Sequence, residues 1–372
     1  MTVTVADIVK RMEKLAPSGL AEKWDNVGLQ VGKMDWPVRR VSVALDPLPP
    51  VVAAACASNT DLLITHHPLT LSPYKTIDFE TPLGAIIQQA AQDHLAIFAA
   101  HTNLDSARGG LNDLLASRLS LKNPTRLLPA ETTDDCKLVV YVPIEHEQIV
   151  LHALFEAGAG TIGGYTSCSF RNRGTGTFNP GSDAQPYSGA RGTLSQADEI
   201  RIEAVVKKKQ LSHVVSHVRG HHPYETMAYD IYPLASIESS QGLGCIGELE
   251  GPIELQTLAL KIKETMGLSA VRLAGRPDLI VKRAAVCSGS GASLLPLFLA
   301  ADAQVFISGD WRYHDARQVE ASNRGLIDVG HFASEHIIVQ DLVQRLQDDL
   351  AEAGLPVFVD ACEIEKEPFL IL

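Results

Sequence analysis

The 372-residue sequence lacks the patterns that mark disulfide frameworks, zinc ribbons and membrane spans. Its six cysteines are scattered and none forms a Cys-x-x-Cys pair, which argues against a zinc ribbon and against paired disulfides. No run of about 18 apolar residues occurs, so we expect no membrane span. The N-terminal segment has no apolar signal-peptide core and is typical of an amphipathic helix, so we expect a cytoplasmic protein.

The sequence also has fewer basic than acidic residues. The sequence has 32 Lys and Arg against 44 Asp and Glu, which gives a formal net charge of -12. A diffuse acidic surface disfavours non-specific binding to nucleic acids and anionic membranes, so we expect neither as a partner. Hydrophobic residues make up 45% and charged residues 20%, which is typical of a globular protein whose core needs no metal or disulfide to fold.

The chain length predicts more than one domain, because a single core rarely extends over so many residues. Residues 1–130 alternate helical patterns with continuous apolar runs, which indicates a mostly parallel sheet covered on both faces. The same alternation returns in residues 240–372. We therefore expect these two segments to form one layered α/β domain, with sheets flanked by helices.

Residues 134–236 follow another pattern and are expected to form an inserted domain. Their predicted elements run β-α-β-β-α-β, which is the order of the ferredoxin-like α+β fold. A loop rich in Gly, Ser, Asn and Pro is expected over Arg171–Asp198. Linkers are expected near 121–135 and 237–250.

Metal-ligating side chains follow three of the predicted strands. The segments are Asp61–Pro68 (DLLITHHP), Leu95–Asp105 (LAIFAAHTNLD) and Leu326–Glu335 (LIDVGHFASE). Strands of an α/β sheet deliver the residues at their carboxyl ends to one crevice, so these side chains are expected to converge. The candidate metal ligands are His66, His67, Asp105, His331 and Glu335.

Each of these segments also has an ordinary interpretation. The paired histidines could lie in solvent or cap a helix, and Asp105 could cap the helix that follows it. Glu335 could serve only to complement the dipole of its helix. Convergence of three strand ends favours metal, and His331 and Glu335 share a helix face at i and i+4. His101 is expected beside the ligands, where it would orient one of them or move a proton.

The ligand set predicts two ions rather than one. Imidazole and carboxylate without thiolate suit Zn, Fe, Mn, Co or Ni and do not select among them. Five ligands exceed the four of a structural zinc site, and they suffice for two divalent ions if one carboxylate bridges. Two ions about 3.5–4 Å apart would activate a bridging hydroxide and clamp a phosphoryl or acyl group.

These motifs resemble those of the Nif-three-like family, dinuclear metal-centre proteins often named GTP cyclohydrolase I type 2 homologues. The matching segments are Trp24–Leu29 (WDNVGL), Leu63–Pro68 (LITHHP), His101–Asp105 (HTNLD) and Gly330–Glu335 (GHFASE). The resemblance covers both outer segments and implies two divalent ions per chain on the five ligands named above. It also implies ring-shaped homohexamers, built as two trimers that face one another around a cavity lined by the metal sites.

The middle segment resembles the PII-like (CutA-like) insert of the longer family members, through His222–Glu225 (HPYE) and Tyr224–Pro233 (YETMAYDIYP). Our leading hypothesis is a metal-dependent hydrolase acting on a nucleotide-like or phosphorylated small molecule. The alternative is a metal-binding regulatory or scaffold protein whose insert senses a ligand or contacts a partner. A third hypothesis is metal storage or delivery. Nothing in the sequence specifies guanine.

Four other features leave alternatives open. Asp25 and Asn26 are expected to build a turn above a packed Trp24, and could instead support metal ligands. Ser288–Ser293 (SGSGAS) is expected to be a tight strand–helix turn, and could instead cradle a phosphate. His213 and His217 lie at i and i+4 and are expected to be exposed helix histidines, and could instead form a second metal site. Asp310 and His314 follow another strand and could face the metal cavity.

Overall fold

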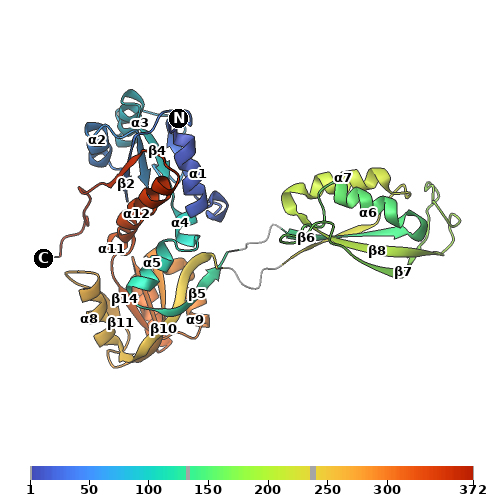
Figure 1. Ribbon diagram of the computed structural model, residues 1–372. Coiled ribbons are helices and arrows are strands. Elements are labelled where there is room, and N and C mark those ends of the chain that lie inside the picture. The colour runs from blue at the N-terminus through green and yellow to red at the C-terminus, as the bar shows by residue number, and fades with distance from the viewer. Residues whose placement is uncertain (1, 131–134, 235–239, 372) are drawn as a thin grey trace. The chain divides into compact units, whose positions relative to one another are not determined.

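The computed structural model describes residues 2–130, 135–234 and 240–371. The chain divides into two compact units, the first made of residues 1–130 and 238–372 and the second of residues 131–237 (Figure 1). Both ends of the chain therefore belong to one unit. Among the described helices, none has the length and apolar character needed to span a bilayer.

The first sheet of unit 1 has five strands in the order β1-β4-β3-β2-β15. These are β1 (Gly28–Val31), β2 (Arg40–Ala44), β3 (Leu62–Thr65), β4 (Ala96–Ala99) and β15 (Phe358–Ala361). The four strands from β4 to β15 are parallel, and β1 runs antiparallel to β4. Four helices flank this sheet (Figure 1): α1 (Val5–Leu15), α2 (Pro49–Ala57), α3 (Pro82–Gln92) and α12 (Ile337–Glu352).

Strand β3 shows why the parallel strands are apolar throughout. Leu62 and Ile64 pack in the core cluster that includes α1 and α12, whereas Leu63 packs in the cluster that includes α2 and α3. Successive side chains of a strand point to opposite faces, so a strand covered on both faces needs apolar residues at every position. The polar residues that follow β3 are thereby confined to its carboxyl end.

The second sheet of unit 1 has six strands in the order β11-β14-β13-β12-β10-β5. These are β5 (Lys122–Pro129), β10 (Gly242–Glu254), β11 (Arg272–Ala274), β12 (Ile280–Ser290), β13 (Val305–Gly309) and β14 (Gly325–Asp328). Strands β12, β13 and β14 are parallel, and the other pairings are antiparallel. The accompanying helices are α5 (Leu111–Arg118), α8 (Leu255–Thr265), α9 (Leu295–Ala300) and α10 (Tyr313–Ala321). Helices α5 and α8 share one core cluster with the sheet, and α9 and α10 share another.

The prediction of linkers near 121–135 and 237–250 is wrong for much of both segments, which form strands. Strand β5 occupies Lys122–Pro129 and pairs with β10, which begins at Gly242. Strand β5 is the edge of its sheet and is mostly exposed, so its sequence lacks the apolar alternation that marks a half-buried strand. It also contains Pro124, which edge strands tolerate.

Unit 2 is an antiparallel sheet in the order β7-β8-β6-β9, with two helices. Its elements are β6 (Asp135–Pro143), α6 (Glu147–Glu156), β7 (Phe170–Phe178), β8 (Ser195–Lys207), α7 (Leu211–His221) and β9 (Tyr229–Pro233). The loop expected over Arg171–Asp198 is therefore wrong at its start and its end, where β7 and β8 form a long hairpin. Strand β7 is an exposed edge strand, and its polar, Gly-containing sequence gives no strand signal.

Two short helices of unit 1 carry candidate site residues, α4 (Thr102–Ser106) and α11 (His331–Glu335). The sequence pattern over Ser334–Glu352 predicts one long helix, and this prediction is wrong because α11 ends at Glu335 and α12 begins at Ile337. Gly330 immediately precedes α11 with a φ of 86°, a conformation that favours glycine. The chain thus turns sharply out of β14 and places one helical turn at the strand end.

Candidate metal centre

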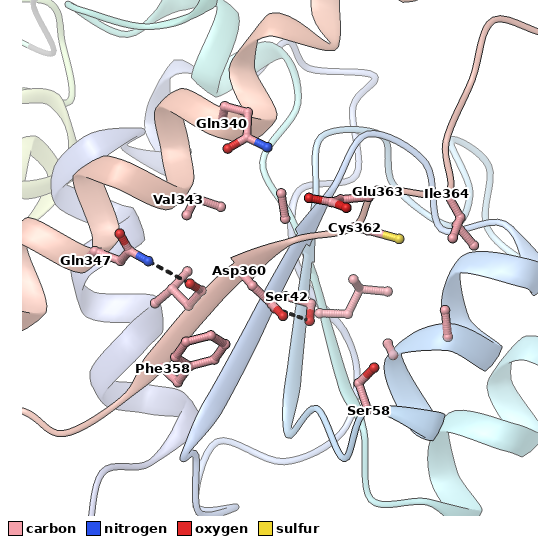
Figure 2. Close-up of a pocket in the computed structure, with 15 residues that line it drawn as sticks. Ser42, Ser58, Gln340, Val343, Gln347, Phe358, Asp360, Cys362, Glu363 and Ile364 are labelled. Atoms are coloured by element: carbon pink, nitrogen blue, oxygen red, sulfur yellow. Dashed lines mark hydrogen bonds between the residues drawn. The ribbon is translucent and has the colours of Figure 1, made fainter.

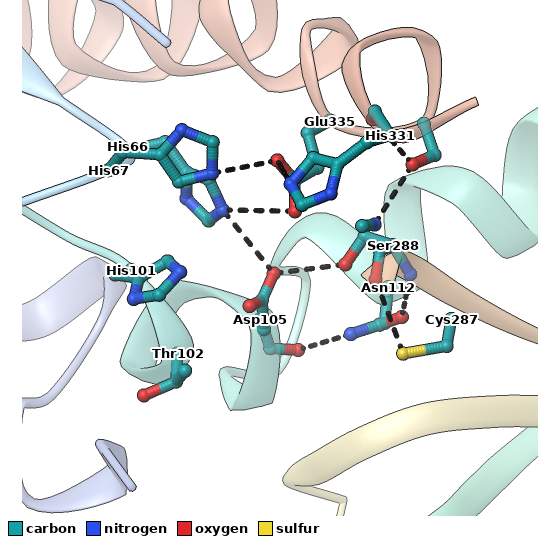
Figure 3. A network of polar contacts seen from close by, with 12 residues as sticks. His66, His67, His101, Thr102, Asp105, Asn112, Cys287, Ser288, His331 and Glu335 are labelled. Atoms are coloured by element: carbon teal, nitrogen blue, oxygen red, sulfur yellow. Dashed lines mark hydrogen bonds and ion pairs between the residues drawn. The ribbon is translucent and has the colours of Figure 1, made fainter. Parts of the chain in front are cut away.

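The candidate ligands come from three strand ends in the two sheets of unit 1 (Figure 3). His66 and His67 follow β3, and Asp105 lies on α4 after β4. His331 and Glu335 begin and end α11, directly after β14. The structure therefore brings together side chains that are far apart in the sequence.

Glu335 lies at the centre of this cluster. Its Oε2 is 3.0 Å from Nε2 of His67 and 2.9 Å from Nε2 of His331. Its Oε1 is 3.7 Å from Nε2 of His66, which is also 3.8 Å from Oδ1 of Asp105. His66, Asp105 and Glu335 are buried, whereas His67 and His331 are partly exposed. One carboxylate thus faces three imidazoles.

Every histidine of the cluster is held through its Nδ1 atom. Nδ1 of His66 donates to the carbonyl oxygen of Ala100 at 2.9 Å. The carboxylates of Asp46 and Asp310 accept from His67 and His331, each at 2.7 Å. These partners are acceptors, so each Nδ1 carries the proton and Nε2 is the atom left for a ligand role.

The cluster shifts several pKa values in the metal-free state. Burial alone would lower the pKa of His67, but contacts with Asp46 and Glu335 outweigh it and raise that pKa to about 10. The contact with Glu335 is the main cause that raises the pKa of His331 to about 9. Burial would raise the pKa of Glu335, yet the neighbouring histidines hold it well below its usual range. Protons therefore substitute for cations among these acceptors.

The residues present fit divalent cations. Nε2 of His66 and Oε2 of Glu335 are buried and form no hydrogen bond of normal geometry with any described residue. Unprotonated imidazole nitrogens and carboxylate oxygens are all acceptors, so a cluster of them needs a positive charge between its members. Nitrogen and oxygen ligands of this kind suit several divalent transition metals.

Among the residues that the structure describes, two groups of three side chains could each hold an ion. Possible ligand atoms within each group lie within 4.8 Å of one another. One group is His66, His67 and His101, and the other is His67, His331 and Glu335. His101, which the sequence places beside the ligands, thus lies within 4.8 Å of possible ligand atoms of His66 and His67. Its Nδ1 is held by Asp25 at 2.9 Å, which leaves Nε2 for the site.

Comparison with known proteins identifies the relatives of this arrangement. Residues 3–368 match the family model described as Duf34/NIF3 (NGG1p interacting factor 3). The chain belongs to the NIF3 family. The resemblance read from the four sequence motifs is thereby confirmed.

Curated relatives of this NIF3-family chain match it from end to end. The protein named GTP cyclohydrolase 1 type 2 homolog from Bacillus subtilis (strain 168) is 36% identical over 371 residues, covering 100% of this chain and 99% of its own. A protein of the same name from Mycobacterium tuberculosis is 39% identical, covering 99% of this chain and 97% of its own.

Solved structures agree on the family. The Bacillus cereus protein related to NIF3 is 34% identical with a TM-score of 0.71, over 100% of both chains. Staphylococcus aureus protein SA1388 is 28% identical with a TM-score of 0.81, over 100% of this chain and 99% of its own.

The Ser288–Ser293 segment of this NIF3-family chain supports the metal ligands. Ser288 donates from its hydroxyl to Oδ1 of Asp105 at 3.0 Å, and its amide donates to Asn112. The amide of Gly289 donates to the hydroxyl of Ser334 at 2.9 Å. These two amides are therefore already bonded within the protein, which disfavours the phosphate-cradle interpretation.

Gly289 leaves room for Glu335. It has a φ of +56°, and a Cβ atom built on it would lie only 2.1 Å from Oε1 of Glu335. The first glycine of the SGSGAS motif is thus required by close approach to a candidate ligand. Sequence spacing alone could not reveal this contact.

The Trp24–Leu29 segment also serves the site, although the packed turn expected for it is wrong in one respect. Trp24 is 56% exposed and meets the ring of His101 edge-on, with ring centroids 6.0 Å apart. Asp25 is buried and accepts from His101 and from both the amide and hydroxyl of Thr102. These contacts outweigh the cost of burial and lower the pKa of Asp25 to about 2.

The other two candidates that follow β13 differ in their contacts. Asp310 faces the site because its carboxylate accepts a hydrogen bond from His331. The ring of His314 packs against the ring of Tyr313. In unit 2, His213 and His217 stack along α7, but the described residues hold no group of three potential ligands there. Sequence reasoning missed Asp46, which lies beyond a strand with no motif around it.

One cavity of unit 1 lies beside the first sheet (Figure 2). It has a volume of about 530 Å³ and is lined by residues of β2, α2, α12 and β15, among them Ser42, Gln347 and Cys362. None of the five candidate ligands lines it. Its position therefore gives no support to a substrate pocket at the metal centre.

Proposed function

We propose that this NIF3-family chain binds two divalent metal ions and hydrolyses a nucleotide-like or phosphorylated small molecule. The observation that carries the proposal is the position of Glu335 among His66, His67 and His331, with Asp105 near the same nitrogen of His66. Such ions, when bound, supply Lewis-acid stabilisation of the negative charge that develops on a phosphoryl or acyl group.

The chain itself would orient the ligands and handle protons. Asp46, Asp310 and the carbonyl of Ala100 fix the imidazole rings with Nε2 facing inward. His101, held by the buried Asp25, would move a proton at its Nε2 atom during hydrolysis. A residue held this rigidly loses little entropy when the reacting groups meet.

The position of Trp24 favours a substrate that contains a planar ring. Its half-exposed indole lies beside His101, at the rim of the candidate centre. Aromatic faces of this kind stack on flat rings, and such contacts contribute about 0.5–1.5 kcal/mol beyond the area that they bury. A nucleobase fits this surface, and the names of the curated relatives, GTP cyclohydrolase 1 type 2 homolog, agree with a nucleotide. Ring opening of GTP is itself a hydrolysis, so it falls within the proposed class.

The proposal also covers the fold of unit 2 and the oligomeric state of the protein. We infer that unit 2 is a ferredoxin-like, PII/CutA-like insert, supported by its β-α-β-β-α-β order and its own core. We also infer a cytoplasmic homohexamer of two facing trimers, on the family resemblance. Sedimentation velocity of the purified chain would give its mass and test the assembly directly.

A direct assay tests the hydrolase. The protein loaded with Zn²⁺, Mn²⁺ or Fe²⁺ is offered nucleotides, phosphodiesters and cyclic amides, and product formation is followed by chromatography. His67→Ala and Glu335→Ala should abolish every activity found, whereas His152→Ala, an exposed histidine of α6, should retain it. Activity that survives both ligand substitutions would refute the mechanism.

The alternative is a metal-binding regulatory or scaffold protein. Unit 2 favours it, because this unit has a hydrophobic core separate from those of unit 1 and could therefore serve as a separate ligand-binding or partner-binding module. An enzyme should keep its chemistry in unit 1 after unit 2 is removed. A regulator should keep its metal but show no turnover with or without unit 2.

A further inference from the structure

The segment that follows β15 lies at the carboxyl edge of the first sheet, where His66 and His67 follow the parallel strand β3. The amide of Cys362 extends the strand pairing by donating to the carbonyl of Val43 at 2.8 Å. Three residues later, the side chain of Glu365 is only 2% exposed, although it carries a carboxylate. A buried carboxylate is costly unless its oxygens accept hydrogen bonds, so its partners identify what it stabilises.

Glu365 accepts two backbone hydrogen bonds from the segment that follows β2. Its Oε2 accepts from the amide of Leu45 at 2.7 Å, and its Oε1 accepts from the amide of Asp46 at 2.8 Å. This arrangement engages both carboxylate oxygens and fixes two consecutive peptide groups. Because both oxygens are engaged, the carboxylate holds this strand end in one conformation.

The same two residues hold His67. The carboxylate of Asp46 accepts from Nδ1 of His67 at 2.7 Å, and the carbonyl of Leu45 accepts from the amide of His67 at 2.9 Å. One short segment therefore connects Glu365 to both the ring and the backbone of a candidate ligand. His67 belongs to both groups of potential metal ligands, so its orientation affects the whole centre.

Glu365 also reaches the helix pair that carries Glu335. Its Oε2 is 3.8 Å from Nε2 of His336, the residue between α11 and α12. That nitrogen is buried and has no hydrogen-bond partner among the described residues. The carboxylate thus lies between the element that positions His67 and the one that positions His331 and Glu335.

We infer that Glu365 is a positioning residue of the metal centre, which acts through the backbone of Leu45 and Asp46 to fix His67. This inference rests on the metal pair of the proposed function but not on any reaction. A merely structural role for Glu365 would lower the stability of the fold without a selective effect on one ion. Groups that hold metal ligands in place typically change metal affinity about 10–100-fold when they are removed.

The test measures Zn²⁺ binding by competition with a chromophoric chelator, together with the thermal midpoint of the metal-free protein. Glu365→Gln replaces one acceptor by a donor and should weaken one of the two ions about 10–100-fold. Glu363→Gln, an exposed glutamate of the same segment, should bind both ions as the wild type does. Glu365→Asp, which is too short to reach both amides, serves if Glu365→Gln does not fold.

A double-mutant cycle with Asp46→Asn shows whether both residues act through His67. The double variant Asp46→Asn with Glu365→Gln should then lose much less affinity than the sum of the single losses. Additive losses, or unchanged Zn²⁺ affinity in Glu365→Gln, would overturn the inference. If the wild type binds two ions and hydrolyses nothing, the proposed reaction fails and this inference stands. If the wild type binds none, both fail.

Discussion

At the scale of single residues, the centre combines acceptors that must share positive charge. In the metal-free protein that charge is supplied by protons on the histidines, which is why the pKa of His67 rises to about 10 and that of His331 to about 9. A metal ion must displace these protons. Metal affinity should therefore increase with pH across the neutral range.

The raised pKa values predict a pH-dependent stability of the metal-free protein. A histidine whose pKa is raised on folding stabilises the fold fully below its unfolded value of 6.5, and this stabilisation is lost as the pH rises. The free energy of unfolding should therefore fall as the pH rises from 6.5 through about 9 and about 10. Urea unfolding at several pH values measures it, in protein stripped with a chelator.

His331→Gln supplies the control for this titration. The variant should lose the part of the decline that is centred near pH 9, because the pKa of His331 is raised to about 9. A wild-type stability that stays flat between pH 6.5 and 10 would contradict the arrangement of acceptors described above.

Gly289 gives a second prediction at this scale. Gly289→Ala should displace the Glu335 carboxylate and weaken metal binding, because the added Cβ would lie 2.1 Å from Oε1 of Glu335. It should also cost about 1–2 kcal/mol, since the left-handed backbone disfavours a side chain. Gly267→Ala is the matched control, with a φ of +66° and no atom within 4 Å of its added Cβ. Metal titration should separate the two variants; equal affinity in both would refute the contact.

At the scale of elements, the apolar strands could be predicted and the exposed ones could not. Strands β3 and β13 are buried throughout and are continuous apolar runs in the sequence. Strands β5 and β7 are exposed edges with polar residues, so only their partners reveal them. The break between α11 and α12 was also missed, because a helix period continues through it while the hydrogen-bond pattern does not.

The join between β12 and α11 carries a third prediction. Ser334 is fully buried, accepts from the amide of Gly289 at 2.9 Å and donates to the carbonyl of His331 at 2.8 Å. Ser334→Ala leaves that amide without its acceptor and should cost about 1–3 kcal/mol in urea unfolding. Ser322→Ala, whose exposed hydroxyl donates to a carbonyl within α10, should change stability by no more than about 0.5 kcal/mol. Equal stability of the two variants would show that this join contributes nothing.

At the scale of the whole molecule, the sequence pattern explains why the N-terminal and C-terminal segments form one unit. It does not reveal every hydrogen-bond partner of the ligands. Convergence of His66, Asp105 and Glu335 was predictable because each follows a strand of an α/β pattern. The hydrogen-bond partners Asp46 and Glu365 were not, because single carboxylates carry no spacing signal. Metal binding by the five ligands stays a prediction.

The points where unit 2 leaves unit 1 lie side by side. Pro129 of β5 pairs with Gly242 of β10, and the amide of Ala130 donates to the carbonyl of Gln241 at 2.9 Å. Replacing residues 131–240 by Asn-Gly should therefore close a two-residue hairpin between these strands. The shortened protein should fold and keep the metal content of the full chain, as judged by circular dichroism and elemental analysis. An insoluble or metal-free product would show that unit 1 depends on unit 2.

The central claim is a paired metal centre around Glu335, and counting ions tests it most directly. Elemental analysis of protein purified without added metal, and again after loading with Zn²⁺ and desalting, gives the number of ions per chain. We predict two ions per chain in the loaded wild type and fewer than two in Glu335→Gln, because the imidazoles of His66, His67 and His331 all face that carboxylate. One ion per chain in the wild type, or two in Glu335→Gln, would contradict the account.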